Sequence, residues 1–209
     1  MSFDFKKEYK EFYAPKVPAV VTVPPMNYIA VNGEGDPNIE GGEYKQAITL
    51  LYGVAFTIKM SRKGGRNIEG FFDYVVPPLE GLWRQDGTQG IDYSRKADFK
   101  WVSMIRLPDF VTGADVEWAV SAAEKSKKAD FSKVWFMTYD EGLCVQCMHI
   151  GPYDDEPASV EMMHRFMESE GYTLDIGEKR LHHEIYLSDA RRVLPEKLRT
   201  VIRHPIKHI

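Results

Sequence analysis

The feature that most restricts the fold of this chain is a succession of strand and helix patterns that occurs twice. In the first half, a β-prone apolar run over residues 26–32 is followed by a Gly- and acid-rich turn ending in Pro37 and by a helical pattern over residues 42–61. In the second half, a run over residues 143–150 is followed by a similar turn ending in Pro157 and by a helical pattern that ends near Gly171. The chain is therefore expected to contain two copies of one structural module.

Such a duplication favours the α+β class. We expect two pseudo-symmetric strand-helix-strand-strand modules that form one curved, mainly antiparallel sheet, with helices on one face and a ligand cleft on the other. The whole chain, residues 1–209, is predicted to be a single domain, with halves at about 20–110 and 111–209 and an N-terminal arm over residues 1–19.

Local patterns place the remaining elements. Strands are predicted over residues 71–76, 99–107 and 134–139, and a capping box at Thr112 starts a helix that runs to about residue 128. Residues 79–83, which follow Pro77 and Pro78, are expected to form an extended turn. Residues 140–142 are expected to join two strands as a hairpin.

Composition excludes several classes of protein. With 209 residues, 44% hydrophobic and 28% charged, the chain is able to bury a core of its own. Its 27 basic and 31 acidic residues give a net charge of −4, and the only basic cluster is the short stretch over residues 61–66. This balance argues against nucleic acid as a partner.

The termini and the cysteines favour a cytoplasmic location. Residues 1–8 carry charges where a signal peptide has its apolar run, and the longest uncharged apolar run, residues 47–58, is too short to span a bilayer and is predicted to be a buried helix. The two cysteines, Cys144 and Cys147, point to opposite faces if they lie on one strand. We therefore expect free thiols rather than a disulfide or a zinc site.

Glu184 is the main candidate for function because it lies at the centre of an apolar strand pattern over residues 181–187. An ionised carboxylate is expensive to bury, so it is retained for a function or paired with another group. Alternation along the strand puts Glu184 and Tyr186 on one face and Ile185 and Leu187 on the other. We expect the apolar pair to face the helices and Glu184 to face the cleft.

Aromatic residues on the neighbouring strands complete the predicted site. Trp101, Trp135 and Tyr139 are expected to surround Glu184 and Tyr186, where their rings would stack on a flat ligand and attract a cation. For Glu184 the alternative is a salt bridge to a core arginine such as Arg106. Each aromatic ring, taken alone, fits core packing as well as ligand contact.

A metal site is not expected. His182, His183 and Glu184 all carry groups that ligate metals, but adjacent residues on a strand point to opposite faces. One strand therefore offers two ligands at most, and no metal and no cofactor are predicted.

Several stretches resemble one known family. They are residues 142–157, which include Gly142-Leu143-Cys144-Val145-Gln146 and Gly151-Pro152-Tyr153-Asp154-Asp155-Glu156-Pro157; residues 183–205, which begin His183-Glu184-Ile185-Tyr186-Leu187-Ser188-Asp189; residues 101–110; and residues 79–83. Together they resemble the stand-alone GyrI-like small-molecule-binding proteins, which are related to multidrug-sensing effector-binding domains and to cyclopropanoid hydrolases.

The resemblance implies three functions. The first is a cytoplasmic protein that binds bulky hydrophobic or cationic compounds, with Glu184 in an aromatic pocket. The second is a hydrolase that opens cyclopropane-bearing genotoxins, in which Glu184 activates water and is the catalytic residue. The third is an interaction protein that antagonises a partner enzyme. None of the three implies a membrane or nucleic-acid partner.

Overall fold

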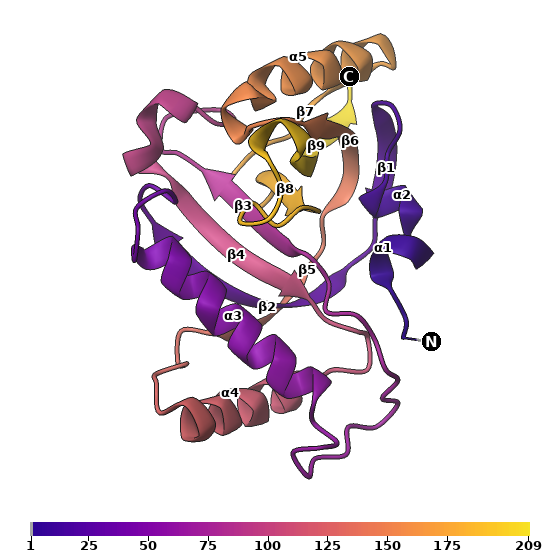
Figure 1. Cartoon of the computed structure of the whole chain (residues 1–209). Helices are drawn as coiled ribbons and strands as arrows, with labels where there is room; N and C mark the ends of the chain where they lie inside the picture. The colour runs from indigo at the N-terminus through magenta and orange to yellow at the C-terminus, as the bar shows by residue number, and fades with distance from the viewer. Residues whose placement is uncertain (1) are drawn as a thin grey trace.

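One large sheet organises the structure, a computed structural model that describes residues 2–209 (Figure 1). Its strands are β1 (Ala19–Val23), β2 (Met26–Glu34), β3 (Leu79–Arg84), β4 (Lys100–Arg106), β5 (Trp135–Tyr139), β6 (Gly142–Ile150), β7 (Tyr172–Leu174), β8 (His182–Tyr186) and β9 (Arg199–His208). The strand order is β1-β6-β9-β8-β3-β4-β2-β5, with β7 paired to β9, and all pairs are antiparallel.

Helices pack on both faces of this sheet. They are α1 (Phe5–Glu8), α2 (Lys10–Tyr13), α3 (Glu43–Lys59), α4 (Gly113–Lys127) and α5 (Glu156–Ser169), with the short 3₁₀ turns η1 (Tyr93–Asp98), η2 (Tyr153–Asp155) and η3 (Pro195–Lys197). The predicted α+β class is confirmed. The two modules are β2-α3-β3-β4 and β6-α5-β8-β9, and they meet where β3 pairs with β8.

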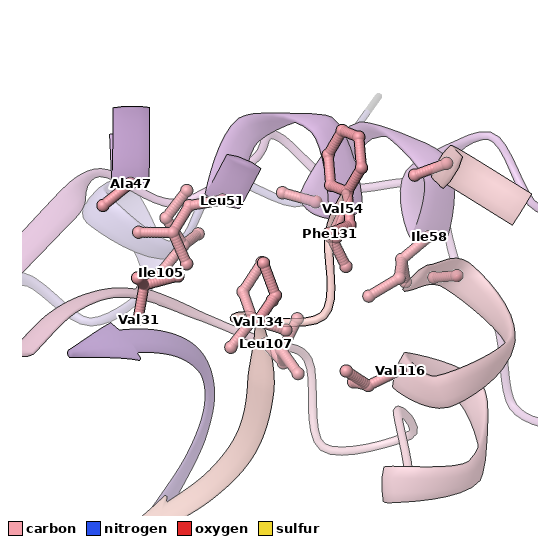
Figure 2. Close-up of a cluster of buried hydrophobic side chains, with 14 of the residues drawn as sticks. Val31, Ala47, Leu51, Val54, Ile58, Ile105, Leu107, Val116, Phe131 and Val134 are labelled. Carbon is pink, nitrogen blue, oxygen red and sulfur yellow. The ribbon is translucent and has the colours of Figure 1, made fainter. Parts of the chain in front are cut away.

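The core of the first module forms between α3, α4 and the sheet (Figure 2). Apolar residues recur along α3 at helical spacing, and Leu51, Val54 and Ile58 are fully buried against Ile105 of β4 and residues of α4. Each such side chain stabilises the fold by about 1.5–3 kcal/mol. The capping box that starts α4 at Thr112 is confirmed.

The second module is built in the same way. Helix α5 packs Met163 and Met167 on Val145 and Cys147 of β6 and on Ile202 of β9. Because Ile202 is paired with Glu184 across β8 and β9, the two side chains share a face. Helices α3, α4 and α5 therefore cover the face of the sheet that carries Glu184.

The cleft is positioned differently from our expectation. It lies between α3 and the segment that leads into α5, on the same face as these helices, because each module places its helix away from the β3–β8 seam. The opposite face is covered by α1 and α2, and Ile185 and Leu187 pack there against Phe5, Phe12 and their neighbours. The apolar pair does face helices, those of the N-terminal arm.

A buried ion network occupies this opposite face. His183 donates from Nδ1 to Glu141 (2.9 Å) and from Nε2 to Glu80 (3.0 Å), and Arg203 donates to Glu141 (2.8 Å) and to Gln146. Burial alone would lower the pKa of His183, but the charges and hydrogen bonds of Glu141 and Glu80 together outweigh it and raise this pKa to about 9. Two cations therefore balance two carboxylates.

Three expected local structures are wrong. Residues 79–83 form the central strand β3 rather than a turn, and residues 71–76 form an irregular segment with a single bridge between Phe3 and Tyr74. Strands β5 and β6 do not pair with each other as a hairpin: β5 pairs with β2, while β6 pairs with β1 and β9. The acid of that turn, Glu141, is instead drawn inside by His183 and Arg203.

Cys144 and Cys147 are free and buried, as expected. Over residues 2–209, none of the helices combines the length and the apolar character that crossing a membrane requires.

Candidate functional site

A cavity of about 780 Å³ opens over the β3–β8 seam. This volume suits a drug-sized organic molecule. Its floor comes from β3 and β8, and its sides come from α3, from η1 and from the segment around η2. The lining includes Tyr44, Ile48, Tyr52, Leu79, Trp83, Tyr93, Phe99, Tyr153, Glu184 and Tyr186.

Glu184 is the buried carboxylate of this cavity, with 6% of its surface exposed. Its Oε1 accepts a hydrogen bond from Nε2 of His182 (2.8 Å), and its Oε2 accepts one from the hydroxyl of Tyr186 (2.7 Å). The Tyr186 hydroxyl in turn accepts from Nε1 of Trp83 (2.9 Å). Both carboxylate oxygens are thus oriented by side chains of β3 and β8, which makes the group rigid and preorganised.

A second carboxyl group, that of Glu156, lies next to Glu184. It is fully buried at the start of α5, and its Oε2 accepts a hydrogen bond from the hydroxyl of Tyr93 (2.6 Å). Burial, followed by the nearby charge of Glu184, raises the pKa of Glu156 well above its ordinary value. This shift favours the protonated form of Glu156.

Aromatic rings form the remaining wall of the cavity. The ring of Trp83 lies 5.3 Å from that of Tyr44 and 5.5 Å from that of Phe99, and the ring of Tyr153 lies 5.7 Å from that of Tyr186. Burial, together with the charge of Glu184, raises the pKa of Tyr153 to about 12. Its hydroxyl is therefore a hydrogen-bond donor throughout the neutral range.

The acidic pair and His182 could also be read as a metal site. Potential ligand atoms of Glu156, His182 and Glu184 lie within 4.8 Å of one another. However, Nε2 of His182 is 2.8 Å from Oε1 of Glu184, whereas two ligands bound to one zinc ion at about 2.0 Å each lie roughly 3.3 Å apart. The short distance identifies a hydrogen bond, and the cluster is better described as an acid–base group.

Of the predicted site residues, the structure brings together only Glu184 and Tyr186 in this cavity. Trp101 shares their face but is covered by α3, with its ring 5.1 Å from that of Tyr44. Trp135 and Tyr139 lie on the opposite face: Trp135 is 42% exposed on the edge strand β5, and Tyr139 packs beside the arm helices. These three aromatic residues do not line the cavity.

The alternative partner of Glu184 is also excluded by position. Arg106 lies on the face opposite Glu184, where its guanidinium stacks over the rings of Phe5 (4.8 Å) and Tyr9 (4.7 Å). Glu184 therefore makes no salt bridge to this arginine.

Sequence reasoning missed several residues of the site. Trp83, Tyr153 and Glu156 belong to the stretches that carry the family resemblance, so a signal was present, but an acid in the cluster 154–156 looks like an ordinary helix cap. No sequence pattern marks Tyr44 and Tyr93 as site residues, because only the tertiary fold brings their segments to the β3–β8 seam.

The fold and the cavity define a small-molecule-binding protein whose pocket lies at the junction of two β-α-β-β modules. The GyrI-like small molecule binding domain model matches residues 17–207, and the chain belongs to this family. None of the curated proteins matches the chain significantly.

Solved structures from Listeria innocua are closely similar. An uncharacterized conserved protein shares 48% identity with a TM-score of 0.92, and a hydrolase shares 46% identity with a TM-score of 0.89; each match covers 99% of this chain and 100% of the other. The C-terminal domain of EcmrR, at 13% identity and a TM-score of 0.56, covers 92% of this chain and 98% of that domain and shares the fold alone.

Proposed function

We propose that the protein is a hydrolase that adds water to bulky, flat, electrophilic compounds, with cyclopropane-bearing genotoxins as the substrate class. The observation that carries this proposal is the pairing of an oriented carboxylate, Glu184, which lines an aromatic cavity, with the neighbouring buried carboxyl group of Glu156, whose pKa is raised. The hydrolase name of a Listeria innocua protein with 46% identity supports it.

In the proposed reaction, Glu184 is the general base. It takes a proton from water while the water oxygen bonds to the strained ring carbon. The ring C–C bond breaks, and its electron pair moves through the conjugated system to a carbonyl oxygen. The hydroxyl of Tyr153 donates a hydrogen bond to this oxyanion. Glu184 then returns its proton to the product anion, so the enzyme is regenerated without a cofactor.

Glu156 supports this chemistry by staying neutral. A second carboxylate beside Glu184 would repel the electrons that accumulate on the substrate, and it would also favour protonation of Glu184. The hydrogen bond from Tyr93 holds the carboxyl group in place.

Binding without turnover is the second candidate. A single negative charge beneath aromatic rings also attracts a hydrophobic cation, and the rings of Tyr44, Trp83 and Tyr153 stand around it. A cytoplasmic location, with which the free thiols agree, and the antagonism of a partner enzyme both stay predictions.

Turnover separates the two candidates. Purified protein is incubated with a molar excess of a cyclopropane-bearing alkylator, and the ring-opened product is quantified. We expect many product molecules per protein and at least a 100-fold loss of turnover in Glu184→Gln. Glu161→Gln, on the exposed side of α5, is the matched control and should keep full activity. Product limited to one equivalent in the unmodified protein would favour the binding protein.

A further inference from the structure

A chain of three histidines leads from Glu184 to the outer surface of α5. His182 of β8 lies beside His204 of β9, with 2.7 Å between Nδ1 of His182 and Nε2 of His204. His204 in turn lies below His164 of α5, with 2.7 Å between Nδ1 of His204 and Nε2 of His164. His182 and His204 are each 1% exposed, whereas His164 is partly exposed.

The hydrogen bonds along this chain have a defined direction of donation. The carboxylate of Glu184 only accepts hydrogen bonds, so Nε2 of His182 carries a proton. Burial, then the neighbouring imidazoles of His182 and His164, lowers the pKa of His204 well below its ordinary value, so this ring is neutral and holds a single proton. Burial also lowers the pKa of His164.

Two placements of the protons on the three histidines are compatible with a neutral His204. In the first, all three rings are neutral and each donates from Nε2 towards Glu184. In the second, His204 donates outward from Nδ1, and His182 must hold protons on both nitrogens. The first arrangement adds no buried charge, and its three protons fill the three contacts of the chain.

The direction matters for the base. If His182 carried its single proton on Nδ1, its Nε2 lone pair would face Oε1 of Glu184 at 2.8 Å. That contact is relieved only when Glu184 is protonated and donates to His182, and a protonated Glu184 accepts no proton from water.

We propose that His204, supported by His164, is a positioning residue that holds His182 in its Nε2–H tautomer and so keeps Glu184 in the form of a proton acceptor. This inference rests on the proposed function of Glu184 as a base. The arrangement is comparable to the outer hydrogen bonds that fix the tautomer of a ligating or catalytic histidine.

Other ionisable groups around the chain are compatible with this role. Glu156, Tyr93, Tyr153 and Tyr186 face Glu184, as described above. From β6, Cys147 faces α5, and its thiol stays neutral because burial raises its pKa to about 12. At the outer end, Glu168 stands one turn beyond His164, and its charge favours protonation of that imidazole.

The experiment compares two substitutions of His204. Glutamine has a nitrogen and an oxygen at about the spacing of the two imidazole nitrogens, so His204→Gln is able to donate to His182 and accept from His164, whereas His204→Leu does neither. We expect kcat to fall about 10- to 100-fold in His204→Leu with KM nearly unchanged. The acidic limb of its pH–rate profile should move to higher pH. His204→Gln should restore both, and Arg165→Ala serves as a surface control on α5.

A second measurement reads the tautomer directly in the unliganded protein. In ¹⁵N-histidine NMR spectra at pH 7.5, we expect the proton of His182 on Nε2 in the unmodified protein and in His204→Gln, and a changed state in His204→Leu. A proton on Nδ1 in the unmodified protein, an unaltered pH profile in His204→Leu, or equal impairment of both variants would overturn the proposal. If the unmodified protein shows no turnover, the proposed function fails, while the NMR result still decides the tautomer.

Discussion

The buried network around His183 makes the stability of this protein sensitive to alkaline pH. The pKa of His183 is about 9 in the folded protein, against 6.5 in an unfolded chain. A base whose pKa is raised by folding stabilises the folded state fully below its unfolded pKa, and this contribution disappears as the pH rises through the folded pKa. The critical window therefore lies between pH 6.5 and 9.

The magnitude follows from the difference between these two pKa values. At about 1.4 kcal/mol for each pH unit, it corresponds to roughly 3.5 kcal/mol. This is a large part of the stability of a typical domain, which is about 5–15 kcal/mol. The side chain is completely buried, so solvent does not screen the interaction.

Urea denaturation at several pH values between 7 and 8.5 measures this effect. In this range the free energy of unfolding should fall by about 1.4 kcal/mol per pH unit. His204 and His164, whose pKa values are lowered, act in the opposite sense, and their effect is complete by about pH 7. His183→Gln should be less stable at pH 7 and should lose the slope, whereas His208→Gln, at an exposed site, should keep it. A flat profile in the unmodified protein, or an unchanged slope in His183→Gln, would refute the reasoning.

Three further predictions concern the cavity. Gly81→Ala places a Cβ 2.6 Å from Nε1 of Trp83, so the indole must move. We expect the free energy of unfolding to fall by about 1–3 kcal/mol and kcat to fall as well. Unchanged values of both would contradict this close contact. Tyr93→Phe removes the hydrogen bond that favours ionised Glu156, so the pKa of Glu156 should rise further. The alkaline limb of the pH–rate profile should therefore move to higher pH. A move to lower pH would count against Glu156 as the group that must stay protonated. Chelation with EDTA should leave Tm and turnover unchanged, and activity that is lost and then restored by zinc would show a metal site.

The general architecture could be predicted from sequence because it depends on repeated patterns. Apolar residues of α3 recur with helical periodicity, and the duplication of that pattern led to the two modules. Strand β3 was missed because Pro77 and Pro78 precede it and because Gly81 is uncommon in a central strand. The reason for that glycine is a contact with Trp83, which no local pattern contains.

The site could be predicted only in part, for a similar reason. Alternation assigns the face of a residue correctly within its own strand, and Glu184 and Tyr186 were found in this way. Alternation does not reveal which residues of another strand lie on the same face of the sheet as Glu184. Trp135 and Tyr139 were therefore assigned to the wrong side of the sheet. For Glu156, the sequence resembles a helix cap, whereas burial raises the pKa of its carboxyl group and favours the protonated form.

The position of the pocket over the β3–β8 seam has a consequence for selectivity. Helix α3 on one side of the pocket and the η2 segment before α5 on the other side belong to different modules, and α3 and α5 are each anchored in their own core. A small rotation of one module against the other would change the width of the pocket, and the apolar cluster on the opposite face, which contains residues of both modules, would have to adjust to it. Substitutions on the opposite face of the seam, at Leu82 or Ile185 for example, lie outside the pocket and are thus a means to retune the size of accepted molecules, and directed evolution for new specificities should include them.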